Sequence, residues 1–155
     1  MEKDLSNKEA LEKFKNIVED VKTCMFITNT AGNNEHTRPM ATIEVEDNGT
    51  LWFYTDVRSI KVEEVNDQHT VHLVYAHPGK SAYLDIWGKA KWSPVVKAWF
   101  PDGITDPNLA LLKVQPQEAY YWEAKSGKMV QFFKMAASIA TGKRLAEGAE
   151  GSLNI

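Results

Sequence analysis

Four polar side chains near the ends of two predicted strands have the types and spacing needed to hold a phosphate group. Arg38 opens the first strand and Thr55 ends the second, while Ser59 and Lys61 follow in a short predicted helix. A turn at 47–49 folds the strands into a hairpin, which gathers the four side chains at one end. Phosphate binds where cations, hydroxyl donors and the first N–H groups of a helix meet. The spacing therefore predicts an anion site there.

Taken singly, the two cations also fit an ordinary surface. Arg38 suits a surface ion pair, and Lys61 suits a solvated helix beside Glu63 and Glu64; only the joint spacing favours a site. Pro39 has no N–H group, so it belongs at a strand edge or where the ladder of hydrogen bonds is interrupted. An interrupted ladder would leave backbone groups available to a ligand, and the apolar residues of both strands suit the wall of a flat ring.

Composition excludes several classes of protein. The chain of 155 residues carries a net charge of −3, which argues against a nucleic-acid partner. No apolar run approaches the ~20 residues that a membrane helix needs. Cys24 is the only cysteine, so no internal disulfide can form, and its apolar neighbours predict a small buried residue. The charged N-terminus lacks a signal-peptide core, so the expected location is the cytoplasm.

Other chemistries lack their sequence patterns. The four histidines have no metal-binding spacing, and neither H-E-x-x-H nor C-x-x-C occurs, so no metal site is expected. There is no G-x-S-x-G elbow, and Cys24 has no evident base partner. Neither a dinucleotide-binding turn nor a P-loop is present. No catalytic acid, base or nucleophile can be named from the sequence.

The remaining pattern predicts one domain over 1–145, followed by a flexible tail over 146–155. Ser6 and Glu9 have the spacing of a capping box, which predicts a helix over 7–22. Besides the hairpin, the predicted strands are 24–30, 70–77, 83–91, 109–114 and 119–122. The other predicted helices are 59–66, 93–100 and 129–141. Mostly antiparallel strands with helices at the edges favour a small barrel or closed sheet, in which Gly88 fits a bulge or a corner.

The hairpin resembles the flavin mononucleotide motif of the pyridoxamine 5′-phosphate oxidase-like split barrels. The residues that carry this likeness are Arg38-Pro39-Met40, Trp52-Phe53-Tyr54-Thr55-Asp56, Ser59 and Lys61. The chain is similar to the general stress protein branch of that family in Gly88-Lys89-Ala90, Trp99-Phe100-Pro101-Asp102-Gly103, Asp106-Pro107-Asn108-Leu109 and Tyr121-Trp122. The resemblance covers about residues 8–145.

The resemblance implies a mainly β protein, a six-stranded antiparallel split barrel with flanking helices. It also implies a homodimer that holds FMN at the subunit interface, with FAD or a deazaflavin as alternative cofactors. Arg38 and Lys61 would pair with the phosphate, and Ser59 would donate to it. The residues that would contact the ring and the ribityl chain are Pro39, Met40, Ala41, Thr42, Ile43, Tyr54 and Thr55.

Three further positions are placed near the flavin by the same resemblance. Tyr83 stands where the true oxidases carry a Gln, which is a departure from their pattern. Trp99 and Trp122 are candidates to reach the flavin of a partner subunit. Ile60 replaces a second basic residue before Lys61, so the phosphate site has one cation fewer than in the oxidases.

The implied function is that of an FMN-binding general stress protein that acts as an oxidoreductase on a small molecule. The cofactor would carry out the redox chemistry. The chain lacks the second basic residue of the oxidases' R-L-x-x-R substrate motif near Arg144, which disfavours a true pyridoxamine phosphate oxidase. Two alternatives are open: a non-catalytic flavin-binding stress protein, and a barrel that binds another phosphorylated or apolar ligand. The sequence names neither the substrate nor the electron donor.

Overall fold

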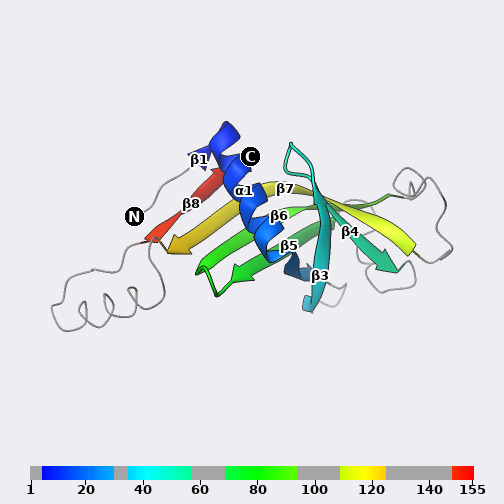
Figure 1. The fold of residues 1–155 in the computed structure, drawn as a ribbon. Helices are drawn as coiled ribbons and strands as arrows, with labels where there is room; N and C mark the ends of the chain where they lie inside the picture. The colour runs from blue at the N-terminus through cyan, green and yellow to red at the C-terminus, as the bar shows by residue number, and fades with distance from the viewer. Residues whose placement is uncertain (1–4, 30–34, 57–68, 94–108, 125–147) are drawn as a thin grey trace.

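The structure of the chain is a computed structural model that describes residues 5–29, 35–56, 69–93, 109–124 and 148–155. Its elements are β1 (Leu5–Ser6), α1 (Asn7–Val21), β2 (Thr23–Asn29), β3 (Glu35–Val45), β4 (Leu51–Asp56), β5 (His69–His77), β6 (Ala82–Ser93), β7 (Leu109–Ala124) and β8 (Gly148–Asn154) (Figure 1). The helices predicted over 59–66 and 129–141, and all but the first residue of that predicted over 93–100, lie outside the described residues.

Six of the strands form a closed antiparallel barrel. Their order is β7-β4-β3-β2-β5-β6, and β6 pairs back onto β7. Every pairing within this ring is antiparallel. The predicted six-stranded antiparallel barrel is therefore confirmed. Alternating inward residues make its core, among which Phe26 and Phe53 meet edge to face at 5.5 Å between ring centroids.

The barrel is split between β3 and β4. These strands pair only at Thr42–Val45, and the last pair before they separate is Thr42 with Phe53. Beyond it, β3 pairs with β2 alone and β4 pairs with β7 alone among the described residues. Pro39 lies in this part of β3, so the ladder is interrupted beside it, as the sequence predicted. One edge of β3 is thus not used by β4.

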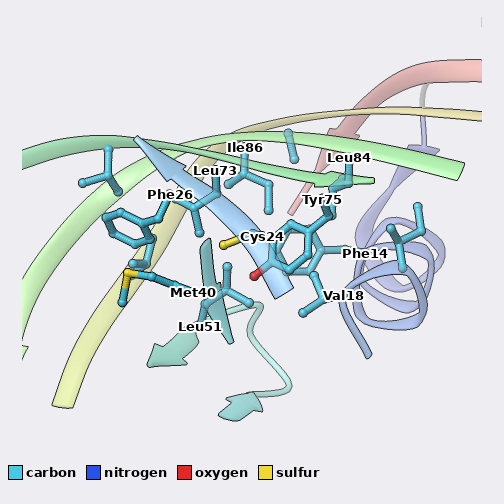
Figure 2. Packing of buried hydrophobic residues seen from close by; sticks show 14 of the residues in the cluster. Phe14, Val18, Cys24, Phe26, Met40, Leu51, Leu73, Tyr75, Leu84 and Ile86 are labelled. Atoms are coloured by element: carbon cyan, nitrogen blue, oxygen red, sulfur yellow. The ribbon is translucent and has the colours of Figure 1, made fainter. Parts of the chain in front are cut away.

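The helix α1 covers one side of the barrel (Figure 1). It begins directly after Ser6, as the capping-box spacing predicted, and it buries a stripe that includes Phe14, Ile17 and Val18. Figure 2 shows Phe14 and Val18 packed among the side chains of the strands. The helix α1 has 15 residues and a polar outer face, so it is too short and too polar to cross a membrane. The described residues contain no helix that is long and apolar enough to do so.

The C-terminal end of α1 is tied to β3 through a single residue. Lys22 has a φ of 63°, in the left-handed region that ends many helices. Its N–H donates to the carbonyl of Val18 at 2.8 Å, and its own carbonyl accepts from the N–H of Thr42 at 2.7 Å. Lys22, which lies between α1 and β2, therefore links the end of the helix to the middle of β3.

Two predictions about the C-terminal half are wrong. The strands expected at 109–114 and 119–122 are one continuous strand, β7, although Pro116 lies in it. Pro116 stands opposite Gly88 at a bulge, in a stretch where β7 has β6 on one side and neither β4 nor β8 on the other. A proline at such a place removes no ladder bond.

The flexible tail expected over 146–155 is also corrected. Gly148–Asn154 forms β8, which pairs with the end of β7 that β4 does not reach, and β1 then adds to β8 in parallel. Leu153 is buried in the core. The short, glycine-rich segment gave little strand signal in the sequence, but an unpaired edge of β7 was available to it.

Replacing Gly88 with alanine is predicted to destabilise the fold, because an added Cβ would lie 2.6 Å from the carbonyl oxygen of Gln115. Backbone on the facing strand cannot move aside without loss of pairing, so the free energy of unfolding should fall by about 2 kcal/mol. Urea denaturation measures this value. Gly79→Ala is the control, since its Cβ meets only the His77 ring in an exposed turn. Equal stability of both variants would contradict the close approach.

Candidate functional site

The inner face of β3 carries Arg38, Met40 and Thr42. Arg38 is half-buried, and its guanidinium donates to the hydroxyl of Thr28, a residue that is 2% exposed. Met40 belongs to the core. The Thr42 hydroxyl lies 2.6 Å from the hydroxyl of Tyr75. A cation is thus held at the split end of the barrel by a buried hydroxyl.

Thr55 lies on the inner face of β4, on the other side of the split. It is 7% exposed and pairs with Ala110 of β7. The last pair before β3 and β4 separate is Thr42 with Phe53, and Arg38 and Thr55 both lie on the open side of this pair. The structure therefore brings them to the same end of the barrel. Ser59 and Lys61 lie outside the described residues, so the complete phosphate site stays a prediction.

The outer face of the split strands is apolar and partly open. Pro39 and Ala41 are exposed on β3, and Ile43 is half-buried beside the end of α1. Tyr54 of β4 is 36% exposed, and Met25, which pairs with Pro39, is 42% exposed. The predicted ring-contacting residues are therefore divided between two faces, with Met40, Thr42 and Thr55 inside and the others outside.

Tyr83 and Trp122 do not join this group within one chain. They stand opposite each other on the outer face of β6 and β7, at the end of β7 that pairs with β8. Tyr54 instead pairs with Leu111, at the β4 end (Figure 1). Positions 111 and 122 are about 36 Å apart along an extended strand. The third predicted aromatic contact, Trp99, lies outside the described residues.

A hollow of about 830 Å³ lies on the outer face of β6, β7 and β8. It includes Trp122, and also Trp87 and Asp85, which the prediction of the site did not use. The His72 ring stacks on Trp87 at 4.2 Å between centroids, and its Nε2 contacts the Asp85 carboxylate. Asp85 and Trp87 are two residues apart in the predicted strand 83–91, a spacing that puts both on one face, but the position of His72 beside them needed the β5–β6 register.

Cys24 is a buried core residue, as predicted, and not a nucleophile. It is 1% exposed, and burial raises the pKa of its thiol to about 12 despite an opposing contact with the Tyr75 hydroxyl. Burial also raises the pKa of Tyr75 well above its usual value. Both groups are neutral near neutral pH. They lie beside each other in the core (Figure 2), and the Tyr75 hydroxyl also contacts the hydroxyl of Thr42 on β3. Within the described ranges, no group of three His, Cys, Asp or Glu side chains is placed to hold a metal ion.

Comparison with known proteins places these features in a family. Residues 9–146 match the family described as pyridoxamine 5′-phosphate oxidase like. General stress protein 26 of Bacillus subtilis (strain 168) is 30% identical over an alignment of 83 residues, which covers 44% of this chain and 59% of that protein. This match therefore spans less than two thirds of the relative.

Two solved structures have a similar fold. A general stress protein 26 candidate from Jannaschia sp. CCS1 superposes with a TM-score of 0.67 at 23% identity, over 93% of this chain and 98% of that one, and it supports the fold alone. The general stress FMN/FAD binding protein of Xanthomonas citri has a TM-score of 0.61 at 28% identity, over 78% of this chain and 93% of that one.

The buried thiol is predicted to be inert in the folded protein and reactive in the unfolded one. At about pH 8 a disulfide reagent such as DTNB should label Cys24 only after guanidinium chloride is added, because the thiolate is the nucleophile. Above the ordinary thiol pKa of 9.0 the unfolded chain loses this proton while the folded chain keeps it up to about 12. The free energy of unfolding should therefore fall as pH rises through that interval.

Cys24→Ala is the control for this pH dependence, since it removes the thiol and keeps Tyr75. The difference between the two pH profiles isolates the contribution of Cys24. Rapid labelling of the folded protein would show that the thiol is accessible and would contradict the assignment.

Proposed function

The chain belongs to the pyridoxamine 5′-phosphate oxidase-like family, and from this we propose that it binds FMN at the split end of its barrel and acts as a flavin-dependent oxidoreductase on a small molecule. One observation carries the proposal. A half-buried arginine, held by Thr28, lies where the β3–β4 ladder is interrupted. The same place therefore offers a positive charge and a strand edge that β4 does not use.

The phosphate would be gripped from both sides of the split. Arg38 supplies a guanidinium suited to two parallel hydrogen bonds with phosphate oxygens. Ser59 and Lys61 follow β4 in the sequence and complete the motif, as a hydroxyl donor and a second cation. Two or three such bonds, each contributing ~1.5–3 kcal/mol, suit a firmly retained cofactor.

The ring and the ribityl chain would lie along β3 and β4. The edge of β3 near Pro39 and Ala41 supplies backbone groups for the polar side of the ring, and Tyr54 and Thr55 border it from β4. FMN is favoured because the motif ends in one phosphate site. The similar Xanthomonas citri protein is named for FMN or FAD binding, so FAD is the first alternative and a deazaflavin the second.

We also propose that the protein works as a homodimer. Tyr83 and Trp122 lie toward the far end of β7 from Tyr54, so one flavin can contact both groups only when a second copy supplies one of them. Trp99 is the other candidate for this contact. Exposed aromatic side chains such as Trp122 are common at subunit interfaces.

A bound flavin would supply the electron transfer, and the protein would bind and orient it. Arg38 would hold the phosphate end, and β3 would border the ring. A second candidate is a flavin-binding stress protein without turnover, for which the similarity to general stress protein 26 supports the stress role alone. The single buried cysteine suits a reducing compartment, and we propose the cytoplasm.

Removing both phosphate-binding cations is predicted to abolish retention of FMN. The Arg38→Ala/Lys61→Ala variant loses two charge-assisted contacts, so affinity should fall by at least about 100-fold. Titration calorimetry of the flavin-free protein with FMN measures this loss, and mass spectrometry of the ligand released from fresh protein identifies the natural cofactor. Lys8→Ala, a charge removal on the exposed side of α1, should bind normally.

The single variants separate lost binding from lost folding. The Lys61→Ala variant should bind FMN more weakly than the unchanged protein. Its circular dichroism spectrum should match that of the unchanged protein, which would show that it folds normally. FMN affinity that is unaltered in the double variant would refute the assignment of this site.

Turnover distinguishes the two candidate functions. An oxidoreductase should lose its visible flavin absorbance when NADH or NADPH is added without oxygen, and should recover it with an added acceptor. Light scattering of the same sample should give the mass of a dimer. A flavin that stays oxidised with both donors would favour the protein without turnover.

A further inference from the structure

The hollow of about 830 Å³ on the outer face of β6, β7 and β8 extends beyond the aromatic contact proposed above. That contact uses the end of the face where Tyr83 stands opposite Trp122. Trp87, which stands opposite Glu118, lies four residues farther along β6, or about 13 Å. Trp87 and Glu118 both line the hollow, whose volume is in the range of pockets that hold small molecules. A small molecule therefore has room beside the aromatic contact.

The walls of this hollow are aromatic. Trp87 is 43% exposed and Trp122 is 39% exposed. Tyr120 also lines the hollow, and its ring lies 4.7 Å from that of Trp122 between centroids. His72 of β5 pairs with Trp87 and stacks on it, with the two rings only 5° from parallel. Because the His72 ring supports the indole from the β5 side, Trp87 offers a fixed flat surface.

The charge of the hollow is negative. Asp85 and Glu118 line it, whereas no lysine or arginine is among the described residues that do so. The Asp85 carboxylate contacts Nε2 of His72, but a carboxylate has about four acceptor sites, so it can also accept from a ligand. Lys89, the next residue on this face of β6, donates to the Thr70 hydroxyl of β5 instead. The carboxylates are therefore not neutralised by this lysine.

Aromatic rings and carboxylates together are the groups that hold an organic cation. The face of a Trp or Tyr ring attracts a positive charge that lies within about 6 Å of its centroid. Carboxylates add Coulombic attraction and accept hydrogen bonds from N–H groups. A phosphate group in the same hollow would meet two like charges, Asp85 and Glu118. The lining therefore favours a flat cation over a flat anion.

We infer that this hollow is the substrate pocket of the proposed flavin site, and that it selects a flat organic cation without a phosphate group, such as a positively charged nitrogen heterocycle. The ring of the substrate would lie on Trp87, and its positive nitrogen would face Asp85 and Glu118. The inference rests on the proposed function, because Trp122, at the other end of the hollow, is a candidate to reach the flavin of a partner subunit.

Titration calorimetry of the FMN-loaded protein tests the inference with three probes of similar shape. These are 1-methylnicotinamide, a cation, nicotinamide, which is neutral, and nicotinate, an anion. The cation should bind at least about 10-fold more tightly than nicotinamide, because only the cation gains from the carboxylates. Nicotinate should bind more weakly than both.

Variants separate the contribution of charge from that of the ring. Glu118→Gln keeps the size of the side chain and leaves the contact of Asp85 with His72 in place. It should weaken the cation by at least about 5-fold and nicotinamide by less than about 2-fold. Trp87→Ala should weaken both probes, because both stack on the indole. Glu12→Gln, which removes an exposed carboxylate from α1, is the matched control and should change neither affinity.

Other outcomes overturn the inference. Nicotinate that binds as tightly as 1-methylnicotinamide would show that charge does not select the ligand. A cation that binds the flavin-free protein but not the FMN-loaded one would show that the flavin, and not a substrate, fills the hollow. In both cases the visible absorbance of the loaded sample would still show retained FMN, so the proposed function would stand. A protein that retains no FMN would refute the proposed function itself.

Discussion

The pairing of β6 with β7 is the constraint on which the rest of the structure depends. It closes the barrel and runs along nearly the whole of both strands. It requires a close approach at Gly88, where any side chain would meet the backbone of Gln115. Because β6 supports β7 throughout, the other edge of β7 can be shared between β4 at one end and β8 at the other. The barrel therefore closes fully on one side and opens on the other.

That division explains the arrangement of the candidate sites. β4 follows β7 away from β3, and the separation leaves Arg38 and Thr55 at an open end of the barrel. The same length of β7 carries Trp122 far from them. The long outer surface of the closed β6–β7 pair carries the hollow that Trp87 and Trp122 line. One closed pair thus creates both an internal opening and an external surface.

Much of the fold follows from local sequence. The capping-box spacing of Ser6 and Glu9 predicted α1, and Pro39 predicted an interrupted ladder. Pro116 misled the prediction, because a proline ends a strand only where its missing N–H would have been paired. β8 was missed because its pairing comes from an available edge and not from its own composition. For the site, spacing brought Arg38 and Thr55 together. The contact of His72 with Asp85 and Trp87 depends on the register between β5 and β6, which no single segment encodes.

The left-handed residue Lys22 gives the molecule a mechanical link. Its peptide groups bond to the last turn of α1 on one side and to Thr42, the final β3 residue before the split, on the other. Lys22 lies between α1 and β2, and because its two hydrogen bonds come from adjacent peptide groups, the end of the helix is held directly against the middle of β3. The packing of α1 and the width of the gap between β3 and β4 are therefore coupled, and whatever loosens the helix also changes the mouth of the barrel.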